Sequence, residues 1–74
     1  MTNNKVFIWL AEEMLKTEFM RWIQSNGHDG ISYPTLSRAQ ERQYQKLDLT
    51  SRQQKAERLA IEFMNEYQQQ KQAA

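Results

Sequence analysis

The strongest constraint on the fold of this chain is an apolar stripe in its last third. Its members recur at i, i+3, i+4, i+7, i+8 and i+11, which places them on one face of an α-helix: Ala56, Leu59, Ala60, Phe63, Met64 and Tyr67. Thr50, followed three residues later by Gln53, is a capping-box pattern. We therefore expect a helix from Ser51 to about Gln70, with fraying of the Gln-rich tail, residues 68–74.

Two more segments carry helical signals. Residues 5–24 are expected to form one long helix capped by Asn3 or Asn4, with two adjoining apolar strips. One strip consists of Ile8, Leu15, Phe19, Trp22 and Ile23, and the other of Phe7, Leu10 and Met14. A turn at Asn26-Gly27 ends this helix. A shorter helix over about residues 33–46 follows, with Ser32 as its cap, Pro34 in its first turn and an apolar side made of Tyr33, Leu36, Tyr44 and Leu47.

Together these segments predict an all-α protein, a single helical domain of three helices (about 5–24, 33–46 and 51–70) within residues 1–74. We expect the first and third helices to pack antiparallel as the main core, with the second across them. The chain has no cysteine to staple so small a core. Because the first helix has more apolar surface than such a bundle buries, we expect a homodimer. The longest apolar run, residues 6–11, is far shorter than the roughly 20 residues of a membrane span, and we expect a cytoplasmic protein with no membrane contact.

The basic residues concentrate in the middle of the chain. Residues 32–58 carry six basic side chains against three acidic ones, whereas the segments on either side are slightly acidic. Arg38, Arg42 and Lys46 stand at i, i+4 and i+8 and are expected to form a basic stripe along the second helix. This field is modest, but its position indicates the part of the chain most suited to a phosphate backbone.

The same segment contains the run Gly30-Ile31-Ser32-Tyr33-Pro34-Thr35-Leu36-Ser37-Arg38-Ala39. It resembles the start of the DNA-reading helix in lac-repressor-family helix-turn-helix domains, which often read Gly-Val-Ser-Tyr-x-Thr-Val-Ser-Arg. The resemblance implies a small bacterial, plasmid or phage regulator that binds double-stranded DNA. It places two residues, Tyr33 and Arg38, near base edges or the adjacent backbone, and the other polar residues of the helix would follow the phosphates. The expected contact set is Tyr33, Thr35, Ser37, Arg38, Arg42 and Lys46.

The resemblance leaves two layouts open. In the family a helix ends directly before the glycine, with alanines where helices cross, whereas Asn26 and Asp29 occupy those positions here. In one layout the helix over residues 33–46 enters the DNA groove. In the other, residues 31–40 form the supporting helix and the helix after Thr50 enters the groove.

A rival interpretation makes the chain a small adaptor or inhibitor that binds another protein through its aromatic first helix. The expected interface residues are Phe7, Trp9, Met14 and Met20, because surplus exposed aromatic and methionine side chains are typical of partner surfaces. We do not expect an enzyme. Glu12 and Glu13 would point about 100° apart on a helix, and the sequence has no metal-ligand spacing and no phosphate loop. No cofactor, metal or small-molecule substrate is expected.

Overall fold

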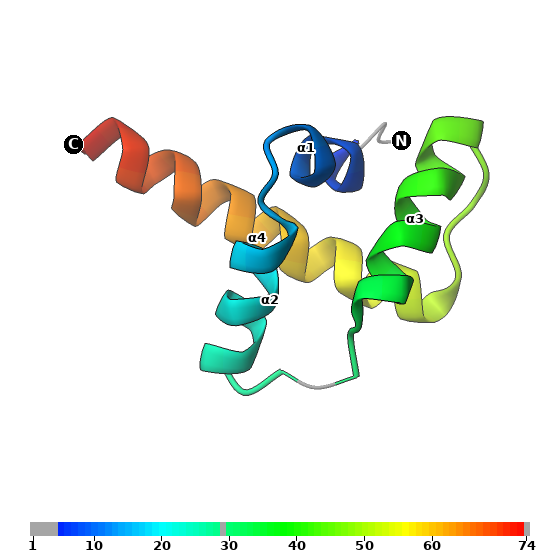
Figure 1. Cartoon of the computed structure of the whole chain (residues 1–74), viewed down its shortest axis with the longest axis horizontal. Helices are drawn as coiled ribbons and strands as arrows, with labels where there is room; N and C mark the ends of the chain where they lie inside the picture. Colours follow the sequence, from blue (N-terminus) through cyan, green and yellow to red (C-terminus); the bar gives the residue numbers. More distant parts are fainter. Residues whose placement is uncertain (1–4, 29, 74) are drawn as a thin grey trace.

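The structure is a computed structural model that describes residues 5–28 and 30–73, and only the backbone of residues 71–73. Its described residues are helical, with no strand: α1 (Val6–Glu12), α2 (Lys16–Ser25), α3 (Tyr33–Gln45) and α4 (Ser51–Ala73). Helix α4 packs against each of the other three helices, and its C-terminal end projects beyond them (Figure 1). No helix in the described part of the chain has the length and hydropathy needed to cross a membrane.

The prediction of one helix over residues 5–24 is wrong, because the chain breaks there into α1 and α2. Met14 adopts a left-handed conformation with φ of 57°. The Leu15 N–H donates to the Leu10 carbonyl at 2.9 Å, and the Met14 N–H donates to the Ala11 carbonyl at 3.2 Å, which is the Schellman pattern of a helix end. The physical reason for the break is the packing of α1, which lies against both α3 and α4. After the break, every member of the two strips except Met14 is buried or half-buried, and Met14 stays 83% exposed.

The predicted ends on either side of the second and third connections, at α2, α3 and the start of α4, are confirmed. Thr50 and Gln53 form a reciprocal capping box: the Thr50 N–H donates to Gln53 Oε1 at 3.0 Å, and the Gln53 N–H donates to Thr50 Oγ1 at 3.3 Å. The Ser32 hydroxyl caps α3 by accepting from the Thr35 N–H. Gly27 has φ of 73° directly after α2, as the turn signal predicted. Helix α4 continues to Ala73, three residues past its predicted end, and the proposed caps Asn3 and Asn4 lie outside the described residues.

One hydrophobic core is shared by all four helices. Its fully covered members come from every helix: Leu10, Phe19, Leu36, Ala39, Ala56 and Ala60 each expose 0% of their surface. Helix α1 packs most extensively on α3 rather than on the last helix alone, contrary to the expected pairing. The reason is that α1 is short after the break and lies across α3, where the Phe7 N–H donates to Gln43 Oε1 at 3.0 Å.

The predicted apolar side of α3 is wrong except at Leu36. Tyr33, Tyr44 and Leu47 expose 43%, 57% and 51% of their surfaces. The side that packs instead carries Leu36 and Ala39, with Gln40 and Gln43 half-buried beside them. Polar side chains can occupy this inner face because the Gln43 amide is hydrogen-bonded both to α1 and to Glu57 Oε2 of α4, the latter at 3.5 Å.

Aromatic side chains of α1 and α2 pack against aromatic residues of α4. Trp9 packs against Phe63 and Tyr67 with ring centroids 6.4 and 6.1 Å apart. Trp22 lies 5.8 Å from Phe63 and donates its indole N–H to Glu66 Oε1 at 3.1 Å. Helix α4 therefore covers most of the apolar surface on which the expectation of a homodimer was based.

Burial also gives α4 a pH-sensitive group. Desolvation raises the pKa of the Glu57 carboxyl above its ordinary value of 4.5. Because the folded state prefers the protonated form, this contribution to stability is fully present below pH 4.5 and is lost as the pH rises through the folded-state pKa. Glu57→Gln is therefore expected to raise the urea midpoint at neutral pH, with a gain over the wild type that shrinks toward pH 4.5. Glu62→Gln, at an exposed position on the same helix, serves as the control and is expected to change little.

Candidate nucleic-acid interface

The six residues expected to contact DNA are divided between two sides of α3. Thr35, Arg38 and Arg42 face the start of α4 across a groove. Tyr33 and Ser37 instead turn toward α2, and Lys46 lies just past the end of α3. The structure therefore brings together half of the predicted set and separates the other half from it.

The groove between α3 and α4 has a volume of about 530 Å³. Each residue that lines it is polar or charged, with three guanidinium groups against one carboxylate: Thr35, Arg38, Glu41, Arg42, Thr50, Arg52 and Gln53. Small-molecule sites are lined predominantly by apolar and aromatic side chains, and none of the groove residues is aromatic. The chemistry of this lining suits an anion with several oxygen atoms, such as a phosphate.

Arg42 holds one wall of the groove in place. Its Nη1 donates to the Asp48 carbonyl at 2.8 Å, and its side chain is half-buried. The Arg42 carbonyl in turn accepts from the Leu47 N–H at 2.9 Å, where Lys46 takes a left-handed φ of 61°. Arg42 therefore fixes the connection from α3 to α4, whereas Arg38 and Arg52 are exposed and do not share that structural task.

The start of α4 contributes the other wall. The capping box fixes Thr50 and Gln53 there, and Arg52 stands in the first turn of the helix. That turn has no acidic residue, so its positive helix-dipole end adds to the charge of the arginines. Sequence reasoning left Thr50 and Arg52 out of the contact set. The capping-box pattern that placed the start of α4 was the available signal for them.

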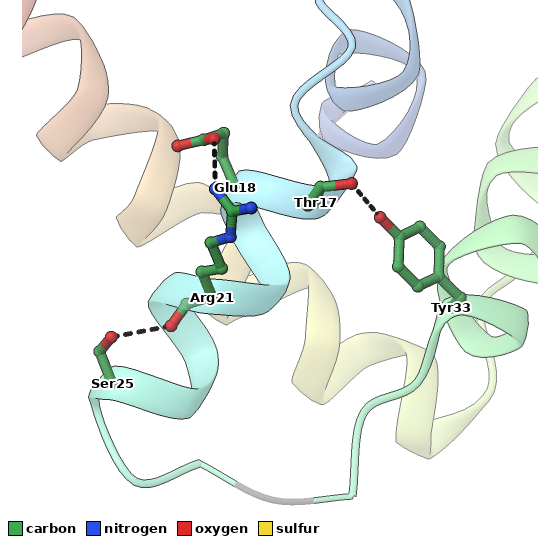
Figure 2. Close-up of polar contacts among 5 residues, drawn as sticks. All are labelled: Thr17, Glu18, Arg21, Ser25 and Tyr33. Carbon is green, nitrogen blue, oxygen red and sulfur yellow. Dashed lines mark hydrogen bonds and ion pairs between the residues drawn. The ribbon is translucent and has the colours of Figure 1, made fainter.

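Tyr33 and Ser37 contact α2. The Tyr33 hydroxyl hydrogen-bonds to the Thr17 hydroxyl, and Figure 2 shows its ring reaching from the start of α3 across to α2. Lys16 Nζ lies 3.5 Å from Ser37 Oγ on the same side. These contacts tie α3 to α2 across the long connection, residues 26–32. That connection is longer than the turn of roughly 3–4 residues in ordinary helix-turn-helix pairs, so α2 and α3 depart from the family layout.

The residues of the rival, protein-binding interface are mostly covered. Phe7 is 1% exposed and belongs to the core, so it is not a surface residue as the rival interpretation requires. Trp9 and Met20 are half-buried against the core. Met14 alone is open, with 83% of its surface exposed at the turn between α1 and α2. The aromatic first segment therefore stabilises the fold and offers little continuous surface to a partner.

Among the described residues, no group of three histidine, cysteine, aspartate or glutamate side chains is placed to hold a metal ion. No protein-family model matches the chain, and the searches of curated proteins and of solved structures give no match either. We call the groove between α3 and α4, which is lined by Arg38, Arg42 and Arg52, the arginine groove.

Proposed function

We propose that this protein is a small regulator that binds double-stranded DNA through the groove between α3 and α4. The observation that carries the proposal is the convergence of Arg38, Arg42 and Arg52 on one polar groove at the start of α4. Guanidinium groups form paired, charge-assisted hydrogen bonds with phosphate oxygens. Threonine hydroxyls, here Thr35 and Thr50, are common additional donors to the same backbone.

The sequence leaves open whether α3 or α4 enters the DNA groove, and in this proposal both helices contact the duplex. Thr35 lies in the first turn of α3 and Arg52 in the first turn of α4. A backbone phosphate held between them would bring the N-terminal turns of both helices to the duplex. In this arrangement α3 and α4 share the phosphate contacts that set the orientation of the protein, and base reading is left to exposed residues near these turns.

The proposal is tested by chemical-shift mapping of the ¹⁵N-labelled protein with a generic DNA duplex at low salt. We expect the largest shifts in two segments, residues 35–42 and 50–53, with little change in α1 or at the C-terminal end of α4. Shifts confined to α1 and α2, or no shifts at low salt, would contradict the proposal. A titration with sodium phosphate at matched ionic strength is the control. Equal shifts with phosphate alone would indicate a general anion site and not a duplex-binding surface.

A further inference from the structure

The break between α1 and α2 is not encoded by the residues that usually end and begin helices. The connection before α3 contains Gly27 and the Ser32 cap, and α4 begins with a capping box. By contrast, residues 5–24 contain neither glycine nor proline, and Leu15, at the N-cap of α2, makes no side-chain cap hydrogen bond. Methionine is a good helix former. In the left-handed conformation, its Cβ crowds the following carbonyl.

Helix α1 is a short helix whose apolar side chains are buried in the core between α3 and α4. Val6, Phe7 and Leu10 are each at most 1% exposed. The helix is seated on α3 through the hydrogen bond from Phe7 to Gln43, and on α4 through the packing of Trp9 against Tyr67. Along the chain it is joined to α2 only through residues 13–15.

We propose that α1 exchanges between two copies of this chain. When residues 13–15 become helical, α1 and α2 form one continuous helix, and the α1 of each copy takes the seat on α3 and α4 of the other. The α1 helix of the other copy fits this site because it has the same sequence as the α1 helix it replaces. Every core contact of α1 therefore forms again, now between the two chains. The hinge alone changes: Met14 leaves its left-handed conformation, and the N–H groups of the first turn of α2 gain helical carbonyl partners.

The proposal is independent of DNA binding. It accounts for two observations together: the uninterrupted helical pattern of residues 5–24, and the left-handed Met14 where that pattern is broken. The exchanged dimer would also carry two arginine grooves, one on each copy.

Two substitutions at Met14 separate the backbone from the side chain. Met14→Ala and Met14→Gly both remove the exposed side chain, but alanine favours the continuous helix and glycine favours the left-handed turn. A dimer contains two hinges, so the preference of each hinge counts twice. We therefore expect the dissociation constant of the Met14→Ala dimer to be at least about a hundredfold lower than that of the Met14→Gly dimer. Light scattering coupled to size-exclusion chromatography over a concentration series measures this. Met14→Gln, a second helix-favouring variant, is expected to follow alanine, and far-UV circular dichroism confirms that each variant is folded.

Isotope mixing identifies the exchange itself. Labelled and unlabelled Met14→Ala chains are unfolded together and refolded, and proximities between chains are detected by isotope-filtered nuclear Overhauser spectra. We expect the Trp9 and Tyr67 rings to show a cross-peak between chains in the dimer. The proposal is overturned if alanine and glycine variants have equal dissociation constants, if both remain monomeric at the highest concentration, or if this cross-peak arises only within one chain.

Discussion

Phe19→Ala is expected to remove a large part of the stability of this domain. Phe19 is 0% exposed, and its ring centroid lies 5.4 Å from that of Phe63 and 6.1 Å from that of Trp22. Truncating a buried phenylalanine costs about 3–5 kcal/mol, because the apolar packing of the ring disappears and the cavity closes only in part. A chain of 74 residues has an expected unfolding free energy of about 4–11 kcal/mol, from roughly 0.05–0.15 kcal/mol per residue. The variant is therefore expected to unfold at a much lower urea concentration, and at the low end of this range it would be partly unfolded without denaturant.

Urea denaturation followed by far-UV circular dichroism measures this loss of stability. Tyr44→Ala is the matched control, because it truncates an aromatic residue that is 57% exposed on α3. A surface change of this kind is expected to stay within about 0.5 kcal/mol. Equal losses of stability in the two variants would show that Phe19 does not occupy the centre of the core.

The second large effect is expected in DNA binding. Removing Arg38 and Arg52 together by alanine substitution is expected to weaken binding to a generic duplex by roughly thirtyfold to a hundredfold at low salt. The figure takes a net contribution of about 1–1.5 kcal/mol for the phosphate contact of each exposed arginine, and about 1.4 kcal/mol is a factor of ten. Both side chains line the groove and are exposed, so their removal is not expected to unfold the chain. Arg42 is left in place because it also holds the Asp48 carbonyl.

Arg21→Ala is the control for charge alone. The Arg21 side chain lies on α2 and pairs with Glu18 at 3.2 Å (Figure 2). It is 72% exposed and is not among the residues that line the groove. Its removal takes away the same unit of positive charge as either groove substitution. We expect less than a threefold loss of affinity, and thermal melting of each variant confirms its fold. The single variant Arg38→Ala is measured beside it. If Arg21→Ala weakens binding as much as Arg38→Ala does, the effect belongs to net charge and not to the groove.

Local signals in the sequence predicted the helix ends well, because each such end is fixed by a few neighbouring residues. The Thr50–Gln53 capping box, the Ser32 cap and the left-handed Gly27 all act within three residues of a helix terminus. The break at Met14 has no such local cause. It follows from the packing of α1 on both α3 and α4, which periodicity within one segment cannot reveal.

The part of the candidate site that lies along one helix could be predicted from the sequence, and the part that depends on how helices pack could not. Arg38 and Arg42 share a side of α3 because of their spacing, and the structure keeps them together. Tyr33 and Ser37 were assigned to the same surface by resemblance, but the position of α2 draws them to the opposite side. Arg52 joins the groove only because the connection between α3 and α4 folds back, a tertiary event held by the hydrogen bond from Arg42 to Asp48.

The measurement that tests the central claim most directly is the salt dependence of duplex binding, for the wild type and for the variant lacking Arg38 and Arg52. Fluorescence anisotropy gives the binding constant at each salt concentration, and the logarithm of that constant falls linearly with the logarithm of salt as phosphate contacts release counterions. The account predicts measurable binding at low salt and a slope that is smaller by about 2 in the variant, one unit for each arginine. An unchanged slope in the variant, or no binding by the wild type even at low salt, would contradict it.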